Sequence, residues 1–188
     1  LVRPLSEVLS KSDLGEKCQK FPFFPCLIKL INAARALSVQ VHPSDEYARK
    51  NEDSFGKTEM WYILEAEEGA GLYLGFKRDV TKEEVEAKIK DNTLVDLLNF
   101  IPVKPGDCYF VKSGTVHAIG AGITLCEIQQ NSNLTYRLYD WGKLGMDGKP
   151  RELHIEKGLK VTNFKKFETI KFDRPLLGKC EYFATYEY

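Results

Sequence analysis

Short strand-like runs bounded by glycine or proline turns fill the middle of this 188-residue chain, and they limit the folds open to it. Apolar and β-branched residues gather at 26–31, 37–41, 60–64, 72–75, 108–111, 116–119, 124–129 and 136–141. Tight turns such as Pro105-Gly106-Asp107 and Gly120-Ala121-Gly122 separate several of these runs. Many short strands punctuated in this way are typical of a β-barrel or a two-sheet sandwich.

The segment 81–99 has a helical pattern instead. Thr81 followed three residues later by Glu84 resembles a capping box. Apolar side chains then recur at helical spacing at Val85, Ile89, Leu94, Leu97 and Leu98. We therefore expect two short helices inserted between strands and packed over the β core. A further helical turn is expected at 45–50, opened by a Ser44 cap.

The charge balance excludes two classes of partner. The chain has 27 basic and 27 acidic residues, for a formal net charge of +0, so it lacks the broad positive charge that captures nucleic acid or an anionic membrane. No apolar stretch reaches the length of a membrane span. Five cysteines, an odd number without a C-x-x-C pair, do not resemble a disulfide framework, which favours the reducing cytoplasm.

Four polar residues in or beside the strands could close around one metal ion. Gln40 and His42 alternate along one strand and should point to the same face. Glu59 opens another strand-like run, and His117 lies in a third. Two imidazoles, one carboxylate and one amide oxygen form a zinc-type shell that leaves positions open for substrate. The same donors would also accept Mn, Fe or Co.

Lys29 and His154 lead to opposite expectations. Lys29 lies inside the apolar run 26–31, where an ammonium group is costly unless it is paired or faces a polar pocket. That favours a functional role for Lys29. His154 follows a turn and matches no ligand pattern, so it is predicted to be structural.

Several motifs occur in a fixed order along the chain. They are Leu37-Ser38-Val39-Gln40-Val41-His42-Pro43, Gly56-Lys57-Thr58-Glu59, Ser113-Gly114-Thr115-Val116-His117-Ala118-Ile119-Gly120, and the run from Glu127 through Tyr136-Arg137-Leu138-Tyr139-Asp140 to Trp141. Together they resemble type I mannose-6-phosphate isomerases of the cupin superfamily, from about Phe21 to Phe167. The resemblance implies a mainly β fold, a cupin-type β-barrel (double-stranded jelly roll) with short helical insertions.

The resemblance also implies an activity and a set of site residues. The expected enzyme interconverts mannose 6-phosphate and fructose 6-phosphate through an enediol and binds one divalent metal, expected to be Zn²⁺. The implied metal ligands are Gln40, His42, Glu59 and His117; the implied catalytic residues are Arg137, Lys57 and Glu127; the implied substrate or phosphate contacts are Lys29, Ser38, Lys57 and Arg137. Asn133 stands where relatives commonly have Asp, so no acid or base role is assigned there.

Domain division and two alternative functions complete the expectations. Residues 1–145 should form a metal-binding cupin domain with a helical insertion near 81–99, and residues 146–188 should begin a second, shortened cupin-like region. Relatives normally carry an N-terminal β segment and a fuller second domain. One alternative is a non-catalytic metal-containing cupin that binds or senses a sugar phosphate. Another is a different metal-cupin enzyme such as an oxygenase, although iron cupins more often present several histidines. The expected partner is a small phosphosugar, and the sequence does not predict the oligomeric state.

Overall fold

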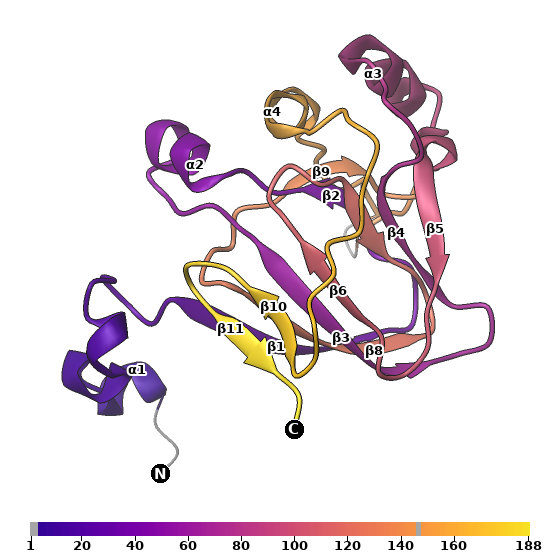
Figure 1. Ribbon diagram of the computed structural model, residues 1–188. Coiled ribbons are helices and arrows are strands. Elements are labelled where there is room, and N and C mark those ends of the chain that lie inside the picture. Colours follow the sequence, from indigo (N-terminus) through magenta and orange to yellow (C-terminus); the bar gives the residue numbers. More distant parts are fainter. Residues whose placement is uncertain (1–3, 146–147) are drawn as a thin grey trace.

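Two facing antiparallel sheets form the centre of the computed structural model, which describes residues 4–145 and 148–188 (Figure 1). One sheet has the order β1 (Cys26–Ala33), β8 (Ile123–Gln130), β3 (Glu59–Ala66), β6 (Cys108–Val111). The other has the order β5 (Leu98–Pro102), β4 (Gly71–Phe76), β7 (His117–Ile119), β2 (Val39–Val41), β9 (Tyr136–Tyr139). The predicted mainly β fold is confirmed. The two facing sheets are not hydrogen-bonded to each other among the described residues, however, so they do not close into one barrel.

An apolar core fills the space between the two sheets. Trp61 of β3, Leu125 of β8 and Leu72 of β4 are all fully buried there. Because side chains alternate along a strand, every second residue of β8 points into this space. Along β8 these inward residues change from apolar Leu125 to polar Glu127 and Gln129. The interior is therefore dry at one end of the sheets and polar at the other.

Three helical segments cover the outer face of the five-stranded sheet. They are α3 (Lys82–Lys90), η3 (Leu94–Leu97) and α4 (Ile155–Val161). Their apolar side chains form one buried cluster with the outward residues of β2 and β9. The Thr81 hydroxyl accepts a hydrogen bond from the Glu84 amide at 3.1 Å, which confirms the predicted cap of α3.

The predicted helical insertion is two residues too long. Leu98 and Asn99 belong to β5, where Leu98 lies opposite Phe76 of β4. The Asn99 amide donates to the carbonyls of residues 74–76, which ties it to the same strand. Pairing with β4 thus overrides the apolar spacing that favoured helix at these two positions.

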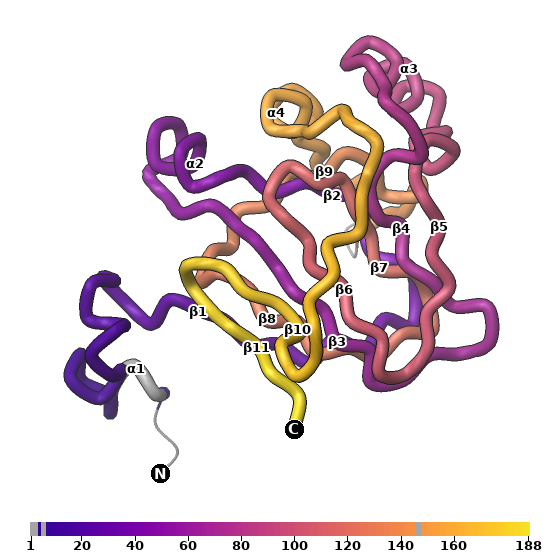
Figure 2. The backbone as a smooth tube through the Cα atoms, in the orientation of Figure 1, coloured from indigo at the N-terminus to yellow at the C-terminus, as the bar shows by residue number. Residues whose placement is uncertain are grey.

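The C-terminal residues after 148 pack on two different surfaces of the paired sheets. The hairpin of β10 (Leu176–Lys179) and β11 (Ala184–Tyr186) crosses the outer face of the four-stranded sheet (Figure 2). There Leu177 packs against Met60 and Phe110. Earlier in the same part, Phe167 packs against the core beside β4.

The N-terminal helical turns lie to one side of the sheets (Figure 1). They are α1 (Leu5–Val8), η1 (Lys11–Leu14) and η2 (Glu16–Cys18). Farther along the chain, α2 (Asp45–Asn51) begins at Ser44, whose hydroxyl accepts a hydrogen bond from the Tyr47 amide at 3.3 Å as predicted. Among the described residues, no helix is both long enough and apolar enough to cross a membrane.

Candidate metal centre

Strand register on the five-stranded sheet aligns three of the predicted site residues. Gln40 of β2 lies opposite His117 of β7 on one side and opposite Arg137 of β9 on the other. Residues opposite each other in antiparallel strands project from the same face of a sheet. Gln40, His117 and Arg137 therefore form one row on this wall of the interior.

The four-stranded sheet supplies the facing wall. Glu59 of β3 lies opposite Gln129 of β8. The next row joins Lys29, Glu127 and Trp61, which are paired across β1, β8 and β3. The predicted strands at 26–31 and 124–129 thus pair and bring Lys29 and Glu127 together, although the two residues are 98 positions apart in the sequence.

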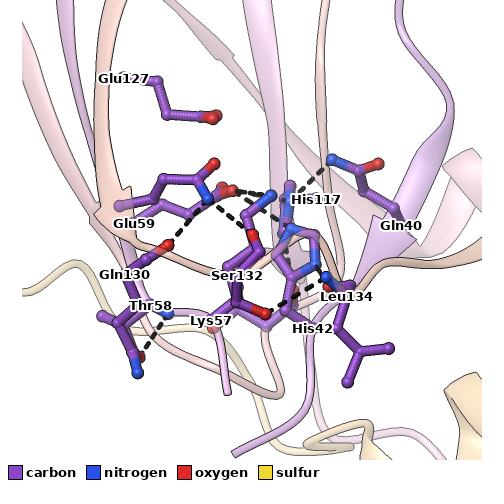
Figure 3. Close-up of polar contacts among 12 residues, drawn as sticks. Gln40, His42, Lys57, Thr58, Glu59, His117, Glu127, Gln130, Ser132 and Leu134 are labelled. Carbon is purple, nitrogen blue, oxygen red and sulfur yellow. Dashed lines mark hydrogen bonds and ion pairs between the residues drawn. The ribbon is translucent and has the colours of Figure 1, made fainter. Parts of the chain in front are cut away.

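His42, Glu59 and His117 converge between the two walls (Figure 3). One ligand atom from each lies within 4.8 Å of the others, and all three residues are buried. His42 Nε2 is 3.3 Å from Glu59 Oε1, and His117 Nε2 is 3.6 Å from Glu59 Oε2. The structure therefore assembles three of the four predicted metal ligands into one compact cluster.

Backbone carbonyls fix which nitrogen of each imidazole faces the cluster. His42 Nδ1 lies 2.9 Å from Leu134 O, and His117 Nδ1 lies 2.8 Å from Thr115 O. A carbonyl only accepts, so each Nδ1 carries the proton and donates it. In the neutral rings each Nε2 then presents a lone pair to the cluster. Carbonyl-anchored histidines of this kind are the usual arrangement around a bound metal.

The atoms that face one another in this cluster suit a bound cation, because none of them can donate a hydrogen bond to another. Two imidazole lone pairs and two carboxylate oxygens meet in one buried space, and all four are acceptors. His42 Nε2 and Glu59 Oε2 are buried without a hydrogen-bond partner, and Glu59 Oε1 has only the Lys57 ammonium beside it, at 2.7 Å. Buried polar atoms are normally satisfied, because leaving one unpaired costs free energy. A divalent metal would satisfy all of them, so the cluster fits the predicted metal site.

Burial and charge set the protonation states in the cluster. Burial lowers the pKa of His117 to about 3, which keeps its imidazole neutral near pH 7. Burial alone would raise the pKa of Glu59, but its neighbours His42 and Lys57 outweigh that effect and hold the pKa well below the usual range. Lys57 is itself buried, with Nζ 2.7 Å from Glu59 Oε1. Glu59 is therefore ionised and ready to bind a cation.

Gln40 is the fourth predicted ligand, and its side-chain amide directs its nitrogen toward His117. Its Nε2 lies 3.4 Å from His117 Nε2, which accepts the hydrogen bond in the neutral ring. A metal would bind the amide oxygen instead, since the oxygen is the acceptor of the amide and the NH2 group only donates. The two amide orientations have nearly the same shape, so rotation of the amide would present the oxygen without moving the strand.

Lys29 and Glu127 form a pair beside the cluster. Lys29 Nζ lies 3.0 Å from Glu127 Oε1 and donates to Gln129 Oε1 at 2.5 Å. The Trp61 indole donates to the other Glu127 oxygen at 3.0 Å. The pairing explains how an apolar strand accommodates Lys29. Trp61 and Gln129 were not predicted; their positions two residues after Glu59 and Glu127 would have placed them on the same inner faces.

Arg137 lies opposite Gln40 on the neighbouring strand, and Ser38 precedes Gln40 by two residues. Arg137 Nη1 donates to Glu152 O at 2.7 Å, while Arg137 Nε is buried without a partner. Burial lowers the pKa of this guanidinium, and neighbouring Arg151 acts in the same direction. His154 exchanges hydrogen bonds with the Arg137 backbone at 3.2 and 2.8 Å, as a structural residue would. Ser38 is buried immediately before β2. The roles assigned to these residues stay predictions.

Comparisons with known proteins agree with the motif resemblance. No family model matches the chain. The chain is 49% identical over 139 residues to the mannose-6-phosphate isomerase ManA of Bacillus subtilis, an alignment that covers 73% of this chain and 44% of that protein. It is 45% identical over 163 residues to the mannose-6-phosphate isomerase of Streptococcus mutans, covering 87% of this chain and 51% of the relative. The chain thus spans about half the length of the curated relatives it matches.

A solved structure supports the same relationship at the level of the fold. The crystal structure of the mannose 6-phosphate isomerase from Bacillus subtilis matches with a TM-score of 0.77 at 38% identity, covering 85% of this chain and 51% of that one. The predicted cupin-type β fold and the predicted resemblance to mannose-6-phosphate isomerases are therefore both confirmed.

Proposed function

We propose that this chain, which is related to mannose-6-phosphate isomerases over most of its length, interconverts mannose 6-phosphate and fructose 6-phosphate with one bound divalent metal. The observation that carries the proposal is the buried convergence of His42 Nε2, His117 Nε2 and the Glu59 carboxylate, flanked by three cationic side chains. The flanking cations are Lys57, Lys29 and Arg137. Their positive charge suits an anionic sugar phosphate.

The proposed metal is Zn²⁺, held by His42, Glu59, His117 and the rotated amide of Gln40. Nitrogen and oxygen donors in a set of four match the preferences of this ion. When bound, such a metal polarises the sugar oxygens and orients the open chain. The surrounding side chains are proposed to transfer the proton and to supply positive charge.

The reaction moves a proton between two carbons of the open-chain sugar. A base removes the proton from C2 of the aldose and returns it to C1, while the hydroxyl proton passes from the C2 oxygen to the C1 oxygen through an enediol. Glu127 is the proposed acid and base, since its carboxylate lies on the inner face of β8 and is buried. Its Lys29 and Trp61 contacts use one lone pair on each oxygen and leave another free on each.

Positive charge stabilises the intermediate and binds the phosphate. Lys57 lies against the Glu59 carboxylate, where its ammonium can stabilise negative charge that develops on the sugar oxygens. Arg137, in register with Gln40, is proposed to bind the phosphate or the enediolate. Lys29 and Ser38 are proposed to contribute to phosphate binding.

The proposed setting is the cytoplasm, where the five cysteines would stay free thiols, as they are in the structure. The proposed division into 1–145 and 146–188 falls beside residues 146–147, which lie outside the described residues. Contacts of Phe167 and Leu177 attach the second part to the two sheets. The division is therefore kept as a proposal: residues 1–145 form the metal-binding cupin domain, and residues 146–188 begin a second, shortened cupin-like region.

A coupled assay tests the proposed function. Purified protein is supplied with mannose 6-phosphate, and fructose 6-phosphate is detected through phosphoglucose isomerase and glucose-6-phosphate dehydrogenase as NADPH. We expect turnover that disappears on chelation and returns with Zn²⁺. Tight binding of mannose 6-phosphate by the zinc-loaded protein without turnover would support a sugar-phosphate sensor and contradict the proposal.

A further inference from the structure

Gln129 is a fully buried polar residue to which neither the motifs nor the comparisons assign a role. It lies on β8, two residues after Glu127 and opposite Glu59 of β3. Its side chain therefore shares the inner face with Glu127, at the polar end of the interior.

The orientation of the Gln129 amide is settled by its partners. Nε2 donates to two backbone carbonyls, Gln130 O and Ser132 O, each at 2.8 Å. Carbonyls only accept, so the nitrogen must face them and the oxygen must face the other way. That oxygen accepts from Lys29 Nζ at 2.5 Å.

Lys29 is consequently held by two acceptors on one strand. Glu127 Oε1 lies 3.0 Å from the ammonium, and Gln129 Oε1 lies 2.5 Å from it. A lysine side chain has a long flexible stem, and one ion pair leaves it several rotamers. The second acceptor fixes the ammonium in one place, even though the side chain is 35% exposed.

Gln129 also joins Lys29 to the loop that orients a metal ligand. The Ser132 carbonyl accepts a hydrogen bond from the Gln129 side chain. The Ser132 hydroxyl accepts a second one from the Leu134 backbone amide, at 3.2 Å. The Leu134 carbonyl in turn accepts from His42 Nδ1 at 2.9 Å. A continuous set of hydrogen bonds therefore connects the Lys29 ammonium with the imidazole of His42.

We propose that Gln129 is a positioning residue that fixes Lys29 beside Glu127 and, through the 130–134 loop, keeps this pair in register with His42. The proposal rests on the proposed function for its kinetic consequence, although not for its structural one. The fixed ammonium would meet the anionic substrate without first losing conformational freedom.

Two substitutions separate positioning from simple structural support. Gln129→Met keeps the size of the side chain and removes all three hydrogen bonds. Gln129→Glu keeps an acceptor for Lys29 and removes the donor to the 130–132 carbonyls. The matched control is Thr124→Val, which removes the Asn32–Thr124 hydrogen bond of 3.2 Å between the same two strands, on their outer face.

Amine labelling measures the structural consequence without requiring activity. Each protein is treated with a low dose of acetic anhydride, and acetylation of Lys29 is measured by peptide mass spectrometry. We expect Lys29 to react severalfold faster in Gln129→Met, and at the wild-type rate in Gln129→Glu and Thr124→Val. Equal rates in Gln129→Met and Thr124→Val, or a rate in Gln129→Glu as high as in Gln129→Met, would overturn the proposal. If Gln129→Met does not fold, Gln129→Glu is compared with wild type and Thr124→Val: an equal rate of Lys29 acetylation supports the proposal, and a rate severalfold higher overturns it.

Steady-state kinetics measure the functional consequence. In Gln129→Met we expect about a 10-fold rise in KM for mannose 6-phosphate, the size expected for one hydrogen bond to a charged group. Zinc content should stay unchanged, as should KM in Thr124→Val. An unchanged KM in Gln129→Met would reject the kinetic role. A wild-type protein without turnover would instead reject the proposed function, while the labelling experiment would still decide the role of Gln129.

Discussion

Gln40 faces His117 directly across the β2–β7 pair, and its amide nitrogen lies 3.4 Å from the imidazole Nε2. The two residues are 77 positions apart in the sequence. On its other side Gln40 is paired with Arg137. Because the sheet sets all three positions, a substitution at one of them should change its own chemistry and leave the other two in place.

His117→Ala should abolish both metal binding and turnover. It removes one of the three convergent ligands and leaves the buried Glu59 carboxylate with one histidine partner. Metal content by mass spectrometry and the coupled assay measure the two effects. The control is His154→Gln, which changes a histidine outside the cluster and should keep the metal. Full metal content in His117→Ala would show that the ion binds elsewhere.

Arg137→Ala should keep the metal and slow turnover by about a hundredfold, the size expected for loss of one charge-stabilising donor. Arg137 is in register with Gln40 across β2 and β9, and it is not one of the converging ligands. Zinc content and kcat distinguish the two effects. Arg78→Ala is the matched control, because Arg78 pairs with Glu84 and its side chain is 61% exposed. Unchanged kcat in Arg137→Ala would remove this residue from the chemistry.

Local patterns in the sequence predicted most of the strands and both helix caps. Ser44 and Thr81 cap their helices as expected, because an N-cap depends on residues only three positions away. His42, Glu59 and His117 could be recognised because each lies in a distinctive motif. Alternation along single strands then placed them on inner faces.

Contacts between distant strands could not be predicted in the same way. Lys29 meets Gln129 only because β1 and β8 pair in one particular register, and 100 residues separate the two. The hydrogen bond from Arg137 to Glu152 O likewise depends on where the 151–154 segment packs. Leu98 entered β5 because β4 offered a partner strand, which no helical spacing could reveal. Register and long-range packing thus account for most of what sequence patterns missed.

Tyr182→Phe should lower the free energy of unfolding at pH 8 and make it depend less on pH between 10 and 12. Burial, together with the hydrogen bond that Tyr182 donates to Asp45 at 2.9 Å, raises the pKa of Tyr182 from 10.0 to about 12. The unfolded tyrosine loses its proton near pH 10, whereas the folded one keeps it until about pH 12. The contribution of Tyr182 is therefore complete below about pH 10 and is lost as the pH rises toward 12.

Urea unfolding across this alkaline range measures the effect. Tyr182→Phe keeps the ring that packs 5.2 Å from Phe21, so the comparison isolates the hydroxyl. We expect the difference in unfolding free energy between wild type and variant to be largest near pH 8 and to shrink by pH 12. A difference that stays constant over this range would show that the folded hydroxyl titrates normally.

Gly75→Ala should destabilise the protein by about 2–4 kcal/mol, because it adds backbone strain and a steric overlap. Gly75 has a φ of 61°, and a Cβ there would lie 2.5 Å from Phe167 Cγ. Relief of the overlap would require Phe167 to move off the core beside β4.

Gly106→Ala provides the matched control for that substitution. Gly106 also has a positive φ, of 87°, but a Cβ there would have no atom within 4 Å. It should therefore cost only the strain, about 1 kcal/mol. Urea unfolding of both variants gives the difference directly. Equal losses would mean that Phe167 does not press on β4, and that the residues after 148 pack less tightly on the two sheets than the structure shows.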